Sequence, residues 1–396
     1  MDAVPPVPIH APERLSGLLG GGISPFTAFF EEYLVPVLRR EKPSKVLVSL
    51  SYLSQLAAGI ELVQLLRRFD TTVTVGGSLP NSLRRTGFGF DVLKTVLPEM
   101  VTGDGSDLLN NETRFLDELS WPQVIGDSRY VSGRPVIPWP LSTGCYWNRC
   151  LFCPDARGKL ETYKPEILAK FLDSIPVETM KKVPLVHFLD SAVPPGILKK
   201  VLPLLRERGL DFFTFARPEP WLVESAPELA DSGCLMLQLG VETGSDRLLK
   251  RFAKGTRSSV ALEAIRACAA SGIRTYVYML LGLPGETPSD MELTVKLLED
   301  AGDAVDFLNF SIFNLPEKCS ITKNPDEFDI ELLDVDTASI RLYRPFLHAG
   351  RNPRIYARKT IEKKFSSIPV VKKALQRTPN WFRASHFPLI VLPGRR

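Results

Sequence analysis

Between residues 135 and 313 the sequence repeats one pattern six times, a short apolar run followed by an amphipathic segment. The apolar runs are predicted strands at 136–142, 185–189, 212–216, 235–240, 275–281 and 305–313. The segments between them have helical periodicity, and Gly209, Gly233 and Gly272 stand where helix C-caps are expected. Alternating strands and helices predict a parallel α/β domain, and six units favour a partial barrel. A flat doubly wound sheet remains the alternative, because periodicity does not fix closure.

The sequence on either side of this repeat is organised differently. Before it, strands are predicted at 45–50 and 72–75, with a helix at 56–69 between them and a helix at 26–40 kinked at Pro36. After about residue 330 the rhythm is lost, and one helix is expected at 361–376, interrupted by Pro369. We therefore predict three domains: a truncated Rossmann-like domain at 1–130, the barrel at 131–325 and a basic extension at 326–396.

Composition narrows the class of protein. The chain has 396 residues, of which 44% are hydrophobic and 24% charged, as in ordinary soluble proteins with two or three domains. No apolar run approaches the roughly 18 residues that span a bilayer. The first residues show neither the basic nor the apolar region of a signal peptide. The expected location is cytoplasmic, without a membrane.

The net charge of +4 conceals an uneven distribution. Residues 341–396 hold fourteen Lys and Arg and a single acid, Glu362, which leaves 35 basic and 44 acidic residues in the rest of the chain. A tail of +13 is thus attached to a body of −9. Such a tail favours a large acidic partner, an acidic polypeptide or nucleic acid, and the alternative is a solvated helix folded onto the acidic body. No RNA-binding domain is recognisable, so a polypeptide is favoured over nucleic acid.

Three of the six cysteines fall within nine residues. Cys145, Cys150 and Cys153 form a C-x4-C-x2-C pattern directly after the first strand of the repeat, where catalytic loops of such folds lie. Three thiolates bind iron–sulfur or zinc, but structural zinc needs four ligands and no fourth Cys or His is near. Three protein ligands leave one metal position open, as in a 4Fe–4S cluster with one unique iron. The other cysteines, at 234, 268 and 319, are predicted buried thiols.

The cysteine pattern, the six repeats and two later motifs resemble the radical S-adenosylmethionine (SAM) superfamily. The later motifs are LQLGVETGS at 237–245 and MLLGLPGE at 279–286. The usual cysteine spacing in that superfamily is C-x3-C-x2-C, and the wider spacing here is similar to the subgroup with cobalamin-binding amino-terminal domains. This resemblance implies a 4Fe–4S cluster, SAM and an electron donor such as ferredoxin or flavodoxin.

The resemblance also implies roles for individual residues. Glu242 would hold the SAM ribose, Phe152 would pack against the adenine, and the backbone around Gly282 would border it. Arg217 is expected to pair with the SAM carboxylate, because its planar fork suits bidentate recognition. The Gly-Gly-Glu usual on the second strand is absent, and Asp190 is the substitute predicted to accept from the SAM amino group.

The amino-terminal region resembles the second half of a cobalamin-binding domain. The residues that carry the resemblance, and that would approach the corrin, are Ser51, Leu53, Gly76, Gly77, Gly103 and Gly105. The Asp-x-His-x-x-Gly motif that supplies the lower cobalt ligand should lie near residues 3–9, which read AVPPVPI. Two interpretations follow, cobalamin bound without a histidine ligand, or a vestigial scaffold that binds no corrin.

The function implied is a cobalamin-dependent radical SAM C-methyltransferase that methylates an unactivated carbon of a peptide or protein. One specific candidate is a C-methylase of a folded protein, of the kind that modifies methyl-coenzyme M reductase in methanogens. The first alternative is a cobalamin-independent radical SAM peptide maturase that performs oxidation, cross-linking or epimerisation. The second is a non-enzymatic, metal-bearing adaptor for an acidic macromolecule.

Overall fold

Six parallel strands form one sheet in which every strand lies beside its predecessor in the sequence. In a computed structural model that describes residues 25–103, 134–154, 158–175, 183–377 and 389, the order is β10-β9-β8-β7-β6-β3. The strands are β3 (Val136–Trp139), β6 (Leu185–Phe188), β7 (Asp211–Ala216), β8 (Cys234–Glu242), β9 (Arg274–Leu281) and β10 (Phe307–Ile312). A doubly wound sheet reverses its strand order at a switch point, and this one does not. The predicted partial barrel is therefore confirmed.

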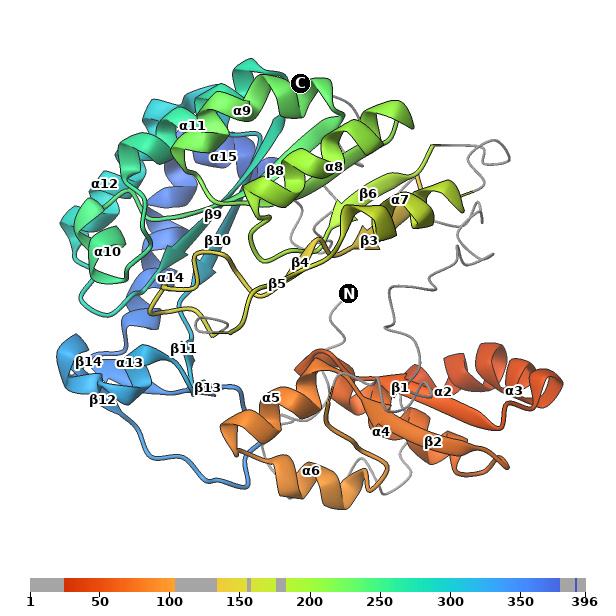
Figure 1. Ribbon diagram of the computed structural model, residues 1–396. Helices are drawn as coiled ribbons and strands as arrows, with labels where there is room; N and C mark the ends of the chain where they lie inside the picture. Colours follow the sequence, from red (N-terminus) through yellow and green to blue (C-terminus); the bar gives the residue numbers. More distant parts are fainter. Residues whose placement is uncertain (1–24, 104–133, 155–157, 176–182, 378–388, 390–396) are drawn as a thin grey trace. The chain divides into compact units, whose positions relative to one another are not determined.

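Helices connect these strands, and several begin at a proline. They are α7 (Pro165–Asp173), α8 (Pro195–Glu207), α9 (Pro220–Asp231), α10 (Asp246–Arg251), α11 (Ser258–Ala270) and α12 (Pro288–Ala301), followed by the 3-10 turn η6 (Gly302–Ala304) (Figure 1). A proline at the first helical position costs no hydrogen bond. As predicted, Gly209, Gly233 and Gly272 end helices with positive φ, at 59°, 93° and 82°.

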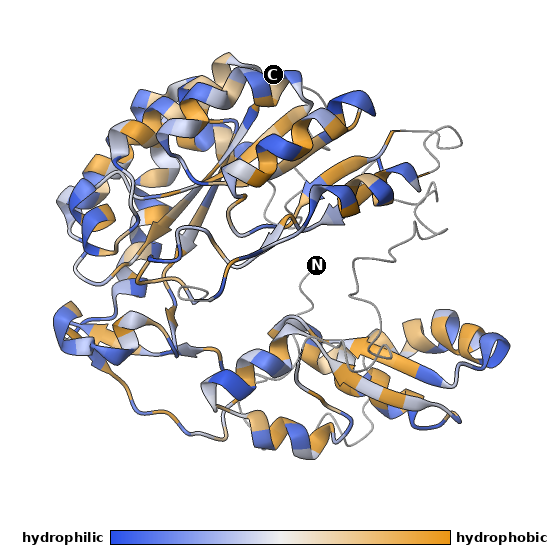
Figure 2. Cartoon of the chain, viewed as in Figure 1, coloured by the Kyte–Doolittle hydropathy of each residue, from blue (hydrophilic) through white to orange (hydrophobic). Residues whose placement is uncertain are grey.

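The sheet is apolar on both faces, and Figure 2 shows its strands as largely hydrophobic. One face packs against the helices through a large core that includes Phe188, Phe212 and Leu239. The other face carries a smaller cluster that includes Phe213 and Tyr276. Burial on both sides explains why the strands read as continuous apolar runs rather than as alternating ones.

The basic tail folds as two helices, not as the single interrupted helix expected at 361–376. Helix α14 (Pro353–Lys363) is followed by the 3-10 turn η8 (Phe365–Ser367) and by α15 (Pro369–Gln376). Pro369 starts a helix because it cannot continue one. Buried residues of both helices, among them Ala357, Phe365 and Val371, belong to the main barrel core. The helical part of the tail is thus packed on the barrel.

Contacts divide the chain into two interleaved units. The amino-terminal unit comprises residues 1–115, 315–318 and 332–345, and the barrel unit comprises residues 116–314, 319–331 and 346–396. Short elements follow β10: β11 (Leu315–Pro316), α13 (Ser320–Lys323), η7 (Pro325–Phe328), β12 (Ile330–Leu332), β13 (Tyr343–Arg344) and β14 (Phe346–His348). No helix within the described ranges is both long and apolar enough to cross a membrane.

The amino-terminal unit contains two parallel strands, β1 (Lys45–Ser49) and β2 (Thr72–Gly76), and Met100 forms a single parallel bridge beside β2. Its helices are α2 (Pro25–Phe29), α3 (Val35–Glu41), η2 (Leu53–Gln55), α4 (Leu56–Leu66), α5 (Ser78–Thr86) and α6 (Phe90–Val96). A π-helical turn at Phe30–Leu34 joins α2 to α3, so the helix passes Pro36 through a π-bulge. Ile340, from a late segment of the chain, is fully buried in this unit's core.

Candidate active site

The loop that carries the three cysteines is closed at its base by a short ladder. Strand β4 (Ser142–Thr143) pairs antiparallel with β5 (Glu161–Thr162), so the residues between them form one excursion beyond β3. Gly144 opens this loop with a φ of 82°, and a Cβ there would lie 2.7 Å from the carbonyl oxygen of Lys159. Only glycine fits such a position. We call residues 144–153 the cysteine loop.

The cysteine loop presents thiols in different environments. Cys150 is buried, and Cys145 and Cys153 are half-buried. Burial raises the pKa of Cys150, while the cations of Lys254 and Arg217 lower it. Among the described residues, no three His, Cys, Asp or Glu side chains stand together as a metal-binding group. The chemistry of the donor set, three thiols on one short loop, is what fits an iron–sulfur cluster.

Arg217 stands beside Cys150, directly after the end of β7. Its Nη1 lies 3.8 Å from Cys150 Sγ, and its Nε donates to Glu219 Oε1 at 2.6 Å. The guanidinium carbon is 4.9 Å from the centroid of the Trp147 ring. The structure thus brings Arg217 to the cysteine loop, as the sequence prediction requires. It also gives Arg217 a partner that sequence reasoning missed, because Glu219 had no assigned role.

Glu242 ends strand β8 in an unusual conformation. The pairing of β8 with β9 shifts register between Gly240 and Glu242, and Glu242 has a φ of 71°. A left-handed backbone in a non-glycine residue costs about 1–3 kcal/mol and occurs preferentially at functional sites. Glu242 Oε1 accepts a 2.7 Å hydrogen bond from Lys254 Nζ. Lys254, only 5% exposed, is the second residue that sequence reasoning missed.

Phe152 lies within the same group of side chains. The centroid of its ring is 5.9 Å from Lys254 Nζ and 6.3 Å from the centroid of the Phe252 ring. Lys254 therefore bonds to one residue predicted to bind SAM, Glu242, and lies near another, Phe152. Four predicted site residues, Cys150, Phe152, Arg217 and Glu242, gather around this lysine.

Asp190 is used differently from the prediction. It follows β6 and is only 2% exposed. Its two oxygens accept hydrogen bonds from the Leu141 amide at 2.9 Å and from Ser142 Oγ at 2.5 Å. Burial raises the pKa of Asp190. The structure thus shows Asp190 anchoring the base of the cysteine loop, and a role toward a SAM amino group stays a prediction.

Gly282 begins the turn after β9, with a φ of 81°. Its amide donates to Glu286 Oε2 at 2.6 Å. A Cβ on Gly282 would lie 3.3 Å from Cβ of Ala357 in α14, so the tail packs against this turn. Burial raises the pKa of Glu286 to about 7. Glu286 therefore fixes the shape of the turn that the sequence predicts to border the adenine.

Among the predicted cobalamin residues, Ser51 and Leu53 follow β1, and Gly76 and Gly77 lie at the carboxyl end of β2. A Cβ on Gly77 would be 2.5 Å from the carbonyl oxygen of Leu50, so this glycine is required by the fold itself. A Cβ on Gly76 would meet only Val101, at 3.8 Å, which leaves space beside it. Gly103 exchanges two 2.8 Å hydrogen bonds with the Asn81 side chain. Ser51 donates its amide to Gln55 and Leu53 begins η2; Gly105 is outside the described residues.

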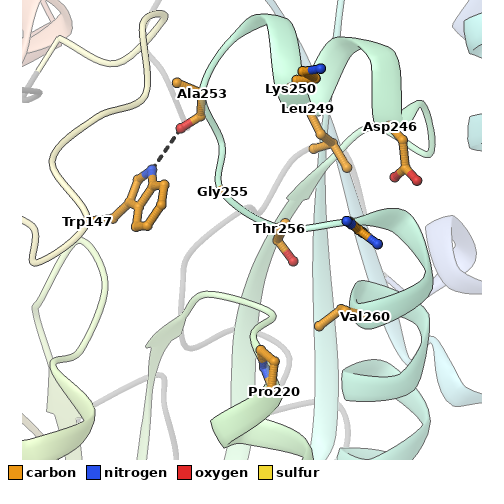
Figure 3. Close-up of a pocket in the computed structure, with 10 residues that line it drawn as sticks. Trp147, Pro220, Asp246, Leu249, Lys250, Ala253, Gly255, Thr256 and Val260 are labelled. Carbon is orange, nitrogen blue, oxygen red and sulfur yellow. Dashed lines mark hydrogen bonds between the residues drawn. The ribbon is translucent and has the colours of Figure 1, made fainter.

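A cavity of about 700 Å³ opens beside the cysteine loop, lined by Trp147, Lys250, Gly255, Thr256, Arg257 and Val260 among others (Figure 3). In Figure 3 the indole nitrogen of Trp147 is joined to the carbonyl of Ala253. None of the residues predicted to bind SAM lines this cavity. This cavity is therefore not the predicted cofactor site.

Comparison with known proteins matches a large part of the barrel to one family model. The model of the radical SAM superfamily matches residues 139–298. A tRNA-2-methylthio-N(6)-dimethylallyladenosine synthase of Corynebacterium urealyticum is 30% identical over 48% of this chain and 38% of that protein. An uncharacterized methyltransferase of Pyrococcus horikoshii is 22% identical over 47% of this chain and 41% of that protein. The chain thus spans less than half the length of these curated relatives.

Solved structures share the fold over more of the chain. The cobalamin-dependent SAM radical enzyme OxsB, with aqua-cobalamin and SAM bound, matches with a TM-score of 0.64 at 16% identity, over 91% of this chain and 65% of that one. The radical SAM methyltransferase TsrM of Kitasatospora setae, with tryptophan and a SAM analogue bound, matches with a TM-score of 0.57 at 17% identity, over 91% and 81%. At these identities the likeness establishes a common fold.

Proposed function

Residues 139–298 match the model of the radical SAM superfamily, and on that premise we propose that the chain is a cobalamin-dependent radical SAM methyltransferase. The observation that carries this proposal is the meeting of the cysteine loop with Arg217 and Glu242 at the carboxyl edge of a parallel barrel sheet. Ligands and catalytic residues of such folds lie at that edge. The family match argues against the metal-bearing adaptor.

The side chains around Lys254 would divide the cofactors among them. Cys145, Cys150 and Cys153 would hold the 4Fe–4S cluster, with Arg217 and Glu242 toward the carboxylate and ribose of SAM. When bound, the cluster and SAM supply a radical that removes hydrogen from an unactivated carbon, and cobalamin supplies the methyl group. The chain's own task is to orient these groups and to exclude water. The buried ion pairs beside Cys150 suit that task.

Cobalamin is the part of the proposal that the amino-terminal unit supports. The fold shared with OxsB and TsrM extends over 91% of the chain. The space beside Gly76 at the end of β2 is open, whereas the space beside Gly77 is occupied by the backbone of Leu50. We therefore assign Gly76 to the approach of the corrin. The competing function is a radical SAM peptide maturase that uses no cobalamin.

Anaerobic reconstitution with hydroxocobalamin separates these two functions. We expect retained corrin absorbance after gel filtration, about one corrin per chain, together with close to four irons and four sulfides. Gly76→Ala should weaken corrin binding about tenfold, since an extra methyl in a filled contact costs about 1–3 kcal/mol. It should leave thermal unfolding unchanged, because its Cβ has room in the free protein. Iron without corrin would establish the cobalamin-independent function.

For the substrate we propose a peptide or protein with acidic side chains. Helix α14 supports this: Ile355 and Tyr356 are 57% and 47% exposed, beside the exposed Arg358 and Lys359. Part of the tail's positive charge is neutralised within the chain, since Lys364 pairs with Glu292 and Lys373 pairs with Asp303. An exposed apolar pair with flanking cations suits an acidic polypeptide.

To test this substrate class, proteins encoded by neighbouring genes are captured on this chain, and their methylation is measured by mass spectrometry. The double change Arg358→Glu with Lys359→Glu should abolish capture of the protein that becomes methylated. Lys372→Glu on α15 is the matched control, because this residue is also exposed and basic but lies outside the α14 surface. Capture that the α14 changes leave intact, or methylation found on tRNA, would contradict a polypeptide substrate on α14.

A further inference from the structure

Four consecutive residues after α10, Phe252 to Gly255, contact the cysteine loop. The carbonyl oxygen of Phe252 accepts from the Leu151 amide at 3.0 Å. The carbonyl oxygen of Ala253 accepts from Trp147 Nε1 at 2.8 Å (Figure 3). Trp147 and Leu151 stand on either side of Cys150 in the sequence. Two backbone carbonyls therefore fix the loop on both sides of its buried thiol.

Lys254 extends these contacts to the strand ends. Its carbonyl oxygen accepts a hydrogen bond from Arg217 Nη2, and its Nζ donates to Glu242 Oε1 at 2.7 Å. The same ammonium lies 5.9 Å from the centroid of the Phe152 ring. A buried lysine is tolerated only when its charge is paired, and here the partner is a predicted cofactor residue. One residue thus links β7, β8 and the cysteine loop.

Gly255 completes the segment by contact with Trp147. Its φ is 76°, and a Cβ at this position would overlap Cζ2 of the Trp147 ring. The ring rests against the glycine and donates to the carbonyl two residues before it. Ala253 also has a positive φ, of 51°. Two left-handed residues in a row of three bring successive carbonyls and Lys254 to face the loop.

We infer that Phe252–Gly255 is a clasp that fixes the cysteine loop relative to Arg217 and Glu242, and that Lys254 is its positioning residue. The ion pair occupies Oε1 of Glu242, which leaves Oε2 to accept from a ligand hydroxyl. Loss of the clasp would free the loop and misplace the carboxylate without removing any cysteine. This inference rests on the radical SAM part of the proposed function and on nothing about cobalamin or substrate.

Lys254→Met tests the positioning role. We expect iron content after reconstitution to stay near that of the unchanged protein, because all three thiols remain. SAM affinity, measured by equilibrium dialysis, should fall about tenfold, and the change that SAM causes in the electron paramagnetic resonance spectrum of the reduced cluster should diminish. Lys254→Arg should restore most of the affinity, since it keeps the charge.

Arg274→Met is the matched control for a broken buried ion pair. Arg274 pairs with Asp306 at 3.2 Å at the start of β9, the opposite end of the sheet. The variant Arg274→Met should leave SAM affinity unchanged. Equal weakening in Lys254→Met and Arg274→Met, or unchanged SAM affinity in Lys254→Met, would overturn the assignment of Lys254.

Gly255→Ala tests the clasp without touching a charge, and Gly272→Ala is its control. Both glycines have similar positive φ, but a Cβ on Gly272 meets nothing within 4 Å. We expect hydrogen exchange at the Leu151 amide to accelerate at least tenfold in Gly255→Ala and to stay unchanged in Gly272→Ala. Equal exchange in the two variants would overturn the clasp. The two experiments measure only SAM affinity and hydrogen exchange in the cysteine loop. Their outcomes therefore do not depend on whether the protein transfers a methyl group.

Discussion

Ser142 donates its hydroxyl to Asp190 at 2.5 Å, and this contact joins the base of the cysteine loop to the end of the second barrel strand. The neighbouring Leu141 amide donates to the other oxygen of the same carboxylate at 2.9 Å. Both oxygens of Asp190 therefore already accept hydrogen bonds within the chain. The loop is anchored at its base by Asp190, and farther along by Trp147 and Leu151.

Asp190→Ala should destabilise the protein more than it weakens cofactor binding. The change leaves two buried donors without an acceptor, and each such loss costs about 1–3 kcal/mol. We expect the free energy of unfolding in urea to fall by about 2 kcal/mol or more, with SAM affinity of the folded fraction nearly unchanged. Asp190→Asn, which keeps one acceptor, should lose less. A tenfold loss of SAM affinity at unchanged stability would instead establish Asp190 as a cofactor residue.

Arg217 and Glu219 should show strong coupling in a double-mutant cycle. Their side chains are 5% and 16% exposed and pair at 2.6 Å. Removing one partner of a buried pair costs about 3–5 kcal/mol, because the other charge is left uncompensated. Arg217→Met alone should therefore be more destabilising than Arg217→Met with Glu219→Gln. Strictly additive free energies of unfolding would show that the pair is not coupled.

Cys150→Ala and Cys234→Ala should distinguish a cysteine that binds the cluster from one that only packs in the core. Cys150 lies on the cysteine loop, whereas Cys234 is fully buried at the start of β8. Replacing Cys150 should abolish SAM cleavage and cluster assembly. Replacing Cys234 should keep the iron content and cost only the stability of a small core truncation, about 1 kcal/mol. Equal iron loss in both variants, measured by metal analysis, would refute the assignment of the cysteines.

Glu286 should make stability depend on pH in the direction opposite to most acids. Burial raises its folded pKa from 4.5 to about 7, so the folded state holds a proton that the unfolded chain releases. The stability from this group is complete below about pH 4.5 and is lost as the pH rises through about 7. The full loss is about 3 kcal/mol, since one pKa unit corresponds to about 1.4 kcal/mol.

Urea unfolding of the unchanged protein and of Glu286→Gln, compared from pH 5 to pH 8, checks this expectation. The glutamine variant carries no titrating proton there, so its stability relative to the unchanged protein should rise with pH. The comparison cancels the contribution of the other titrating groups. A difference in free energy that stays constant across this range would show that Glu286 does not titrate as its burial implies.

The barrel was predictable from the sequence because its signal is local and repeated. Each apolar run and each C-cap glycine is visible within a few residues, and the strand order then follows from short connections. The cysteine spacing and the family resemblance together predict that Arg217 and Glu242 lie at one edge of the sheet. The contacts there agree with that expectation: Arg217 reaches Cys150, and Glu242 reaches the lysine beside Phe152.

The roles of Lys254 and Glu219 could not be predicted from the sequence, because ion pairs leave no periodic pattern in it. Glu219 pairs two residues away, and Lys254 pairs twelve residues away across a helix, so only the folded backbone shows either partner. The helices of the tail differ from the prediction for a related reason. Charge is the most visible feature of the tail in the sequence, whereas its sparse apolar residues, such as Ala357 and Val371, decide where it packs. A proline read as an interruption was instead the first residue of a helix.

The interleaving of the two units sets the order in which the protein can be completed during synthesis. Ile340 is fully buried in the amino-terminal core, and Gly89, in the first quarter of the chain, has its amide bonded to the carbonyl of Thr337. The first unit to leave the ribosome must therefore wait until all six strands of the barrel sheet have emerged before its own core is filled. A chain that stops at residue 330 would carry every cysteine and every barrel strand, yet its earliest-made core would remain open.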